Sequence, residues 1–304
     1  MNGEQGTGAM VWQAPAGLSE QSIRADAERI ARIALEEDGR PDVTTLVTAA
    51  AGERASGRIE YRSGGVVAGI PWAEALARQC DCVLRWSVSD GEIVQSGAVI
   101  GWLDGSFADV LRAERPLLNV LQRACGIANH TAAYVEAVAG TPCRILHTRK
   151  TAPGLRLLDV AAVLAGGGHL HRVDLSHAVM IKDNHWQALE RSRRSLAEAL
   201  NAARGRGVIS CQVEVESVDQ VDSATAAGAT RILIDNQSPE TVRTWGLRAR
   251  AGRPGIEVEA TGGIHLGNVR WYAEAGVDFV SIGALTHSVK AADVGLEIEG
   301  SGER

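Results

Sequence analysis

Apolar and polar residues follow two different patterns along the chain, and the first pattern gives way to the second near residue 140. In the first part, residues 19–37 have apolar positions at helical spacing and Ser19 as N-cap, which predicts an amphipathic helix. The apolar positions of this stripe are Ile23, Ala27, Ile30, Ile33 and Ala34. The segment Arg40–Thr45 contains a proline and is predicted to end the helix.

After this helix come short apolar runs separated by glycines, which predict an open antiparallel sheet. The runs are Gly57–Tyr61, Gly65–Ile70, Val83–Val88 and Ala98–Leu103. A helix is predicted over Pro71–Gln79, and a second, long helix over Asp109–Ala139.

Beyond this point, β-branched runs alternate with helical segments, and a βαβα pattern predicts parallel strands. The predicted strands are Arg144–Thr148, Ala178–Ile181, Ile209–Val215, Arg231–Ile234, Ile256–Ala260 and Phe279–Gly283. The predicted helices between them include Trp186–Arg204, Val218–Ala227 and Val269–Ala275. Six repeats, with a further strand hidden near Leu170–Leu175, favour a closed (β/α) barrel over an open doubly wound sheet.

Composition narrows the class of protein. A length of 304 residues suits one large or two ordinary domains, and 45% hydrophobic residues suffice for a sizeable core. A net charge of −6 argues against a general nucleic-acid binder, and the chain has no apolar run long enough for a membrane span. The five cysteines are scattered without zinc spacing, which predicts reduced thiols and a cytoplasmic location. Residues 1–18 are predicted to be a flexible tail.

Lysine is rare in this chain, since only Lys150, Lys182 and Lys290 occur among 31 basic residues. Two of these lysines lie close together in the sequence, and five of the eight histidines fall in the same stretch. A compact ammonium that is kept where arginine is otherwise preferred indicates an anion site, with phosphate as the first candidate ligand.

Polar residues follow the predicted parallel strands, where the active sites of barrels lie. These residues are Thr148, Arg149 and Lys150; Lys182, Asp183, Asn184 and His185; Glu214 and Glu216; Asp235 and Asn236; Thr261, Gly262 and Gly263; and Ile282, Gly283 and Ala284. In chain order, the ends of the predicted strands thus carry cations, then acidic residues, then two turns that contain glycine. Glycines allow backbone amides to approach a phosphate closely.

The loop Gly166–Arg172 adds His171 as a hydrogen-bond donor and Arg172 as a clamp for a carboxylate. A zinc site built on His169 and His171 is disfavoured, because no third ligand stands at a useful spacing.

Several motifs, in order, resemble the quinolinate phosphoribosyltransferase family, also called nicotinate-nucleotide pyrophosphorylase (carboxylating). They are Glu114–Arg123, Thr148–Arg156, Gly166–Arg172 and Ile181–His185, extended by Glu37–Asp38, Asp42–Thr45, Val213–Glu216, Leu233–Asn236 and Gly283–Ser288. The resemblance covers nearly the whole chain.

The resemblance implies an α/β fold with an N-terminal α/β sandwich domain, residues 19–125, and a C-terminal (β/α) barrel of the type II phosphoribosyltransferase kind, residues 126–287. Residues 288–304 would return to the first domain. It implies a pentosyltransferase of de novo NAD biosynthesis, which transfers a phosphoribosyl group from phosphoribosyl pyrophosphate (PRPP) to quinolinate with decarboxylation. It also implies a homodimer whose sites are completed by Arg115 from the neighbouring subunit.

Residue roles are carried over in the same way. Quinolinate would be held by Arg115, Thr148, Arg149, His171, Arg172 and Lys182. PRPP would be met by Lys150, Asn184, His185, Glu214, Asp235, Thr261, Gly262, Gly263, Ile282, Gly283 and Ala284. The resemblance implies Lys150, Lys182, Glu214 and Asp235 as the catalytic set, with Mg²⁺ held by Glu214 and Asp235, in part through water.

The chain departs from the family pattern at His147, Pro116, Leu117, Cys125, Leu170 and Thr261, and Pro116 and Leu170 stand nearest the carboxylate clamp. These departures keep open a paralogous pyrophosphorylase that acts on another aromatic acid. A Schiff-base aldolase built on Lys150 or Lys182 leaves the clustered arginines unexplained. A metabolite sensor without activity would be expected to have lost one of Glu214, Asp235 or Lys150, and all three are present.

Overall fold

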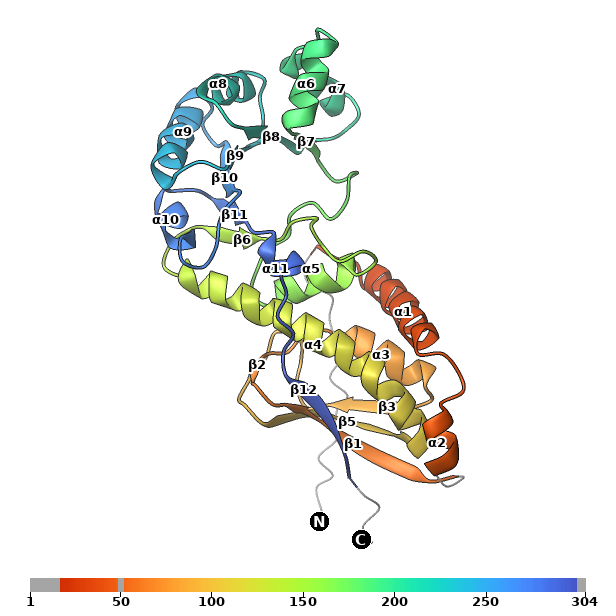
Figure 1. Ribbon diagram of the computed structural model, residues 1–304. Coiled ribbons are helices and arrows are strands. Elements are labelled where there is room, and N and C mark those ends of the chain that lie inside the picture. Colours follow the sequence, from red (N-terminus) through yellow and green to blue (C-terminus); the bar gives the residue numbers. More distant parts are fainter. Residues whose placement is uncertain (1–16, 49–51, 300–304) are drawn as a thin grey trace, which may run out of the picture. The chain divides into compact units, whose positions relative to one another are not determined.

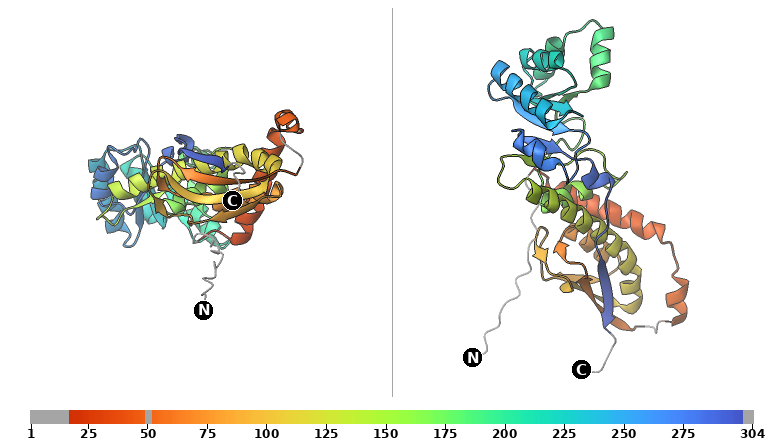
Figure 2. Two further views of the ribbon diagram at one scale, coloured as in Figure 1. Left: turned by 90° about the horizontal axis from the view of Figure 1, so that it is seen from below. Right: turned by 60° about the vertical axis from the view of Figure 1, so that its left-hand side comes forward.

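The computed structural model in Figures 1 and 2 describes residues 17–48 and 52–299. The chain forms two compact units. The first contains the residues up to His130, Ala152–Gly167 and the residues from Val289 onward, and the second contains Thr131–Thr151 and Gly168–Ser288. Residues 1–16 of the expected flexible tail, and residues 300–304 of the expected returning segment, lie outside the described residues.

The first unit begins with helix α1 (Glu20–Glu37), whose N-cap is Ser19 as predicted: the Ser19 hydroxyl accepts from the Ser22 N–H at 3.0 Å. Its buried apolar positions are Ile23, Ala27, Ile30, Ala31 and Leu35. The assignment of Ile33 to this stripe was wrong, because that side chain lies at the margin of the buried face and is 36% exposed.

The main sheet of the first unit is antiparallel, in the order β12-β1-β5-β3. Its strands are β12 (Val294–Glu299), β1 (Arg54–Tyr61), β5 (Ala98–Ser106) and β3 (Val83–Trp86). Figures 1 and 2 show α1, α3 (Ile70–Gln79) and the start of α4 (Phe107–Ala137) on one face of this sheet. The predicted α/β sandwich is therefore confirmed.

One predicted strand of the first unit is much shorter than expected. Only β2 (Gly65–Val66) forms from the run that ends at Ile70, and it pairs with β4 (Ile93–Val94) in a separate ribbon. Gly69, at φ +99°, turns the chain so that Ile70 starts α3. The remaining helices of this unit are α2 (Val43–Thr48) and α5 (Arg156–Ala165).

The second unit is built on six parallel strands in the order β6-β11-β10-β9-β8-β7. They are β6 (Arg144–Leu146), β7 (Val179–Ile181), β8 (Cys211–Val215), β9 (Arg231–Asp235), β10 (Glu257–Thr261) and β11 (Phe279–Ser281). The first and last strands pair, which is the neighbour relation of a barrel. No strand forms over the segment near Leu170–Leu175; next to it, His169 makes a single bridge to Leu146 on the free side of β6. Among the described residues β6 and β7 therefore stand at the two edges of the sheet, which is curved as in a barrel but not closed by strand pairing.

Helices cover the outer side of this curved sheet (Figure 1). They are α6 (Asp183–Arg191), α7 (Leu196–Arg204), α8 (Val218–Ala226), α9 (Pro239–Gly252) and α10 (Val269–Glu274); a further short helix, α11 (Ala284–His287), follows β11. The single helix expected over Trp186–Arg204 was wrong. The chain breaks between α6 and α7, where Ser195 and Glu198 form a capping box that starts a new helix. No helix in the described ranges is long and apolar enough to cross a membrane.

Alternation along the central strands sorts side chains between two faces. Val213, Val215, Ile232 and Ile234 are fully buried, whereas Glu214, Leu233 and Asp235, which alternate with them, reach a cavity on the inner side. This alternation brings polar side chains from different strands to one place.

Candidate active site

The second unit encloses a cavity of about 580 Å³ at the ends of its parallel strands. Its wall contains His147, Thr148, Arg149, Lys150, His171, Arg172, Met180, Lys182, Glu214, Leu233, Asp235, Asn236, Glu259, Thr261, Gly262, Gly263 and Ser281. Most of these residues stand at or just after the last residue of a strand, as the barrel prediction requires.

Three cations in this wall have no acidic partner. Arg149, Lys150 and Arg172 make no ion pair with any described residue, and Arg149 Nε is buried without a hydrogen-bond partner. Burial lowers the pKa of Arg172, and the neighbouring Arg149 lowers it further. These cations repel one another, and an anion bound among them would relieve that repulsion, so this part of the cavity favours an anionic ligand.

The fourth cation of the wall, Lys182, is paired. Its Nζ donates to Glu214 Oε2, and Glu214 is only 9% exposed. Trp186 Nε1 donates to the Glu214 carbonyl at 2.9 Å, which ties the start of α6 to the end of β8. Burial raises the pKa of Glu214; Lys182 opposes this shift and the carboxylate of Asp235 adds to it. Glu214 and Asp235 are therefore close enough to interact within the cavity.

A turn with unusual backbone angles follows β10. Gly262 has φ +81° and Gly263 has φ +62°, and a Cβ atom on Gly262 would overlap the Asn236 side chain. Asn236 is itself at φ +52°, and its Nδ2 donates to Asp235 Oδ2 at 2.7 Å. Only glycine fits this turn, which leaves backbone next to the cavity as a phosphate-binding loop requires.

Most of the predicted site residues lie in the cavity wall, and six do not. Asn184 and His185 are exposed in the first turn of α6, where His185 Nδ1 accepts from the Lys182 N–H at 3.0 Å. Ile282, Gly283 and Ala284 are not part of the wall, although Gly283 adjoins Lys150, whose Cδ would lie 3.1 Å from a Cβ on Gly283.

The sixth, Arg115, belongs to α4 in the first unit, and its side chain is 60% exposed. Its nearest acid is the adjacent Glu114, at 3.9 Å. The predicted role of Arg115 requires a second subunit and remains a prediction.

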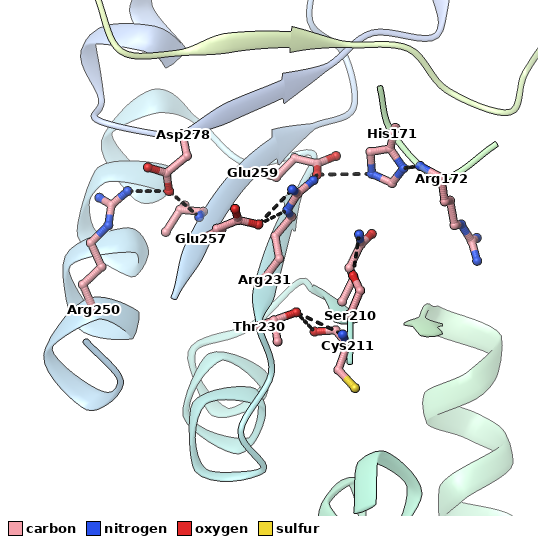
Figure 3. A network of polar contacts seen from close by, with 12 residues as sticks. His171, Arg172, Ser210, Cys211, Thr230, Arg231, Arg250, Glu257, Glu259 and Asp278 are labelled. Atoms are coloured by element: carbon pink, nitrogen blue, oxygen red, sulfur yellow. Dashed lines mark hydrogen bonds and ion pairs between the residues drawn. The ribbon is translucent and has the colours of Figure 1, made fainter. Parts of the chain in front are cut away.

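Sequence reasoning missed several wall residues, of which Glu259 is the most informative. The omissions are His147 as a wall residue, Met180, Leu233, Glu259 and Ser281. Glu259 is fully buried and lies within ion-pair distance of His171 and Arg231 (Figure 3). Period-two reading of Glu257, Glu259 and Thr261 along β10 would have predicted that these side chains share the inner face.

No group of three or more His, Cys, Asp or Glu side chains in the described part of the chain could hold a metal ion. Magnesium, however, is commonly bound by one or two carboxylates together with substrate phosphates. Glu214 and Asp235, two interacting carboxylates on neighbouring strands, fit that donor set.

Comparison with known proteins gives consistent results over almost the whole chain. Residues 42–125 match the description "Quinolinate phosphoribosyl transferase, N-terminal domain", and residues 127–297 match the corresponding C-terminal domain. The nicotinate-nucleotide pyrophosphorylase [carboxylating] of Mycobacterium leprae is 38% identical over 292 residues, covering 92% of this chain and 100% of that protein. Quinolinate phosphoribosyltransferase [decarboxylating] 1 of Nicotiana glauca is 37% identical, covering 90% of this chain and 83% of that protein.

Solved structures agree with these relatives. The nicotinate-nucleotide pyrophosphorylase of Francisella tularensis superposes with a TM-score of 0.84 at 32% identity, covering 91% of this chain and 97% of that chain. The corresponding structure from Ehrlichia chaffeensis gives a TM-score of 0.80 at 31% identity, covering 93% and 100%.

Proposed function

Because the chain belongs to the quinolinate phosphoribosyltransferase family, we propose that it converts quinolinate and PRPP into nicotinate mononucleotide, pyrophosphate and CO₂. The observation that carries this assignment is the group of three unpaired cations, Arg149, Lys150 and Arg172, in one cavity with two interacting carboxylates. A dicarboxylate and a pyrophosphate ester together supply the negative charge that these cations lack, and a ribose cation in the transition state suits the acids.

The reaction needs orientation and charge more than a nucleophile from the protein. The lone pair of the pyridine nitrogen forms a bond to ribose C1, and the bond from C1 to the pyrophosphate oxygen breaks. The ring, now a pyridinium, accepts the electron pair released when the adjacent carboxylate leaves as CO₂, and a proton then takes the place of that carboxylate.

We assign the residues according to what they face. Arg149 and Arg172, whose guanidinium groups repel each other, hold the two carboxylates of quinolinate. Lys150 meets the leaving pyrophosphate, and Lys182 can bridge both substrates. Glu214 and Asp235 stabilise the developing positive charge on the sugar and its hydroxyls.

Magnesium fits the same pair of acids as a proposed cofactor. When bound, it would neutralise charge on the pyrophosphate, and Glu214 and Asp235 would hold it in part through water. Activity is expected to disappear after chelation with EDTA and to return with added Mg²⁺. Full activity in metal-free enzyme would exclude this part of the proposal.

We further propose a homodimer in which Arg115 of one subunit completes the carboxylate site of the other. The exposed, weakly paired state of the Arg115 side chain supports this role. Mixing an Arg115→Ala variant with a Lys150→Ala variant is expected to restore part of the activity, because hybrid dimers would contain one intact site. No recovery in exchanged dimers would contradict shared sites.

All five cysteines are free and buried, which supports a reducing compartment, and we propose the cytoplasm. Cell fractionation with an antibody against the chain would test this location. Recovery in an oxidising compartment would contradict it.

The function itself is tested by incubating the protein with quinolinate, PRPP and Mg²⁺ and detecting nicotinate mononucleotide by mass. Lys150→Ala and Arg172→Ala are expected to abolish quinolinate-dependent pyrophosphate release while the thermal midpoint stays close to that of the wild type. Turnover of another pyridine acid in place of quinolinate would favour the paralogue. Borohydride trapping of a carbonyl substrate on a lysine would favour the aldolase.

A further inference from the structure

A chain of charged and polar groups extends from the cavity wall along the strands of the second unit (Figure 3). Arg231 donates to Glu257 Oε2 at 2.8 Å and to Glu259 Oε2 at 3.0 Å, and its guanidinium lies 4.0 Å from the centre of the Phe279 ring. Because the Arg231 side chain is only 12% exposed and contacts Glu257, Glu259 and Phe279, its guanidinium is held in one position.

Glu259 connects Arg231 to His171 in the loop Gly166–Arg172. The same oxygen that accepts from Arg231 lies 3.3 Å from His171 Nε2, and Glu259 is 0% exposed. Although burial raises the pKa of Glu259, His171 and Arg231 outweigh it and leave the pKa below its usual value. Glu259 is therefore a carboxylate that can only accept hydrogen bonds.

The other ring nitrogen of His171 is also engaged. His171 Nδ1 accepts from the Arg172 backbone N–H at 2.8 Å. A nitrogen that accepts carries no proton, so the ring proton belongs on Nε2, which lies 3.3 Å from Glu259 Oε2. The His147 ring packs edge-on against His171, with centroids 6.4 Å apart. Both ring nitrogens of His171 are thus used within the protein, which leaves no free donor for a substrate carboxylate.

We propose that Glu259, anchored by Arg231, is a positioning residue that holds His171 as the neutral Nε2–H tautomer, so that His171 fixes the backbone of Arg172 and aims its guanidinium into the cavity. In Figure 3 the Arg172 side chain extends away from the network, and it is part of the cavity wall. The proposal rests on the function given above, in which Arg172 clamps a carboxylate. It changes the role of His171 from a substrate ligand to a link between the barrel interior and that clamp.

Substitutions at Glu259 separate this role from simple packing. Glu259→Met removes the acceptor while keeping the length of the side chain. It is expected to raise KM for quinolinate about 10- to 150-fold, the range for losing a hydrogen bond to a charged group, with kcat and KM for PRPP changed by less than about threefold. Glu259→Gln is expected to recover most of this loss, because Arg231 orients the amide oxygen to the position where His171 donates.

Glu257→Met is the matched control. Glu257 accepts a hydrogen bond from the same arginine but makes no hydrogen bond or ion pair with His171 in the described part of the chain, and its side chain is 46% exposed. Its KM for quinolinate should equal that of the wild type. Equal losses in all three variants, or losses in kcat and both KM values together with a lower thermal midpoint, would show a purely structural role and overturn the proposal.

Nitrogen NMR of histidine-labelled wild-type protein tests the tautomer directly and requires no folded variant. The shifts of His171 are expected to show a protonated Nε2 and an unprotonated Nδ1 at neutral pH. An imidazolium, or a proton on Nδ1, would overturn the proposal even if Glu259→Met failed to fold. If the wild-type protein made no nicotinate mononucleotide but His171 showed this tautomer, the proposed function would fail while the interior link remained.

Discussion

Arg149→Met tests whether the cavity cations are kept for a ligand or for the fold. In the structure, Arg149 has no ion-pair partner among the described residues, its Nε is buried without a hydrogen bond, and it lowers the pKa of Arg172. Methionine keeps most of the apolar stem and removes the orphaned donor and the repulsion. We therefore expect the ligand-free protein to keep or slightly raise its thermal midpoint.

Ligand binding should change in the opposite direction. One charge-assisted hydrogen-bonded contact is worth about 1.5–3 kcal/mol, which corresponds to a loss of affinity of roughly 10- to 150-fold. Calorimetric titration with quinolinate measures this loss. The upward shift in thermal midpoint that quinolinate gives the wild type should shrink in parallel, since that shift depends on the ratio of ligand concentration to Kd.

Arg231→Met is the matched contrast, since it makes the same chemical change at an arginine that is paired. Removing Arg231 leaves the buried Glu259 without its cation, which costs about 3–5 kcal/mol, and each kcal/mol lowers the midpoint of a domain of this size by roughly 2–4 °C. If Arg149→Met lost as much stability as Arg231→Met, or bound quinolinate with wild-type affinity, the reasoning from unpaired charge would be refuted.

Three further predictions follow from single contacts. Glu214→Gln should abolish activity yet raise the thermal midpoint, because burial raises the pKa of Glu214 in the folded protein and the wild type therefore loses stability as pH rises above about 4.5. The gain in thermal midpoint from glutamine should be larger at pH 7 than at pH 4, and an equal gain at both pH values would contradict the raised pKa. Gly262→Ala should weaken PRPP binding at least about tenfold and lower the thermal midpoint more than Gly276→Ala does, because Gly276 has a similar φ but open space around it. Equal losses of thermal midpoint in the two variants would show that backbone strain alone accounts for the loss. Arg123 donates to both carboxylate oxygens of Asp159 at 2.8 Å, so Asp159→Leu removes the carboxylate that this arginine binds and should destabilise the protein by about 3–5 kcal/mol in a thermal unfolding scan. A loss under about 1 kcal/mol would contradict this prediction.

The sequence predicted the parts of the fold that depend on local periodicity. All six parallel strands were found because β-branched runs stand out between helical segments, and Ser19 was found as an N-cap. The break between α6 and α7 was missed because the residues on either side continue the same helical composition, and only the capping box at Ser195 interrupts them. Ile70 was misplaced because an apolar run shows no sign of the left-handed angle at Gly69.

The site was predicted where residues follow strand ends and was missed where they lie inside the barrel. Lys150, Lys182, Glu214 and Asp235 all reach the cavity, as strand-end reasoning required. Glu259 also reaches the cavity, but it lies within β10, and its importance depends on Arg231 and His171, which only the folded arrangement of the strands brings near it. Tertiary contacts of this kind leave no local pattern in a single sequence.

The pairing of β12 with β1 has a consequence for synthesis of the chain on the ribosome. These strands are joined in register from Ser56↔Glu299 to Tyr61↔Val294, so the edge of β1 cannot be closed until the last described strand has emerged. At roughly 5–20 residues per second, that edge stays open for about 10–50 s after β1 is made. During this time it offers unsatisfied backbone groups to other nascent chains. We therefore expect a stop codon just before Val294 to cause aggregation during synthesis, even though every residue of the cavity would already be present.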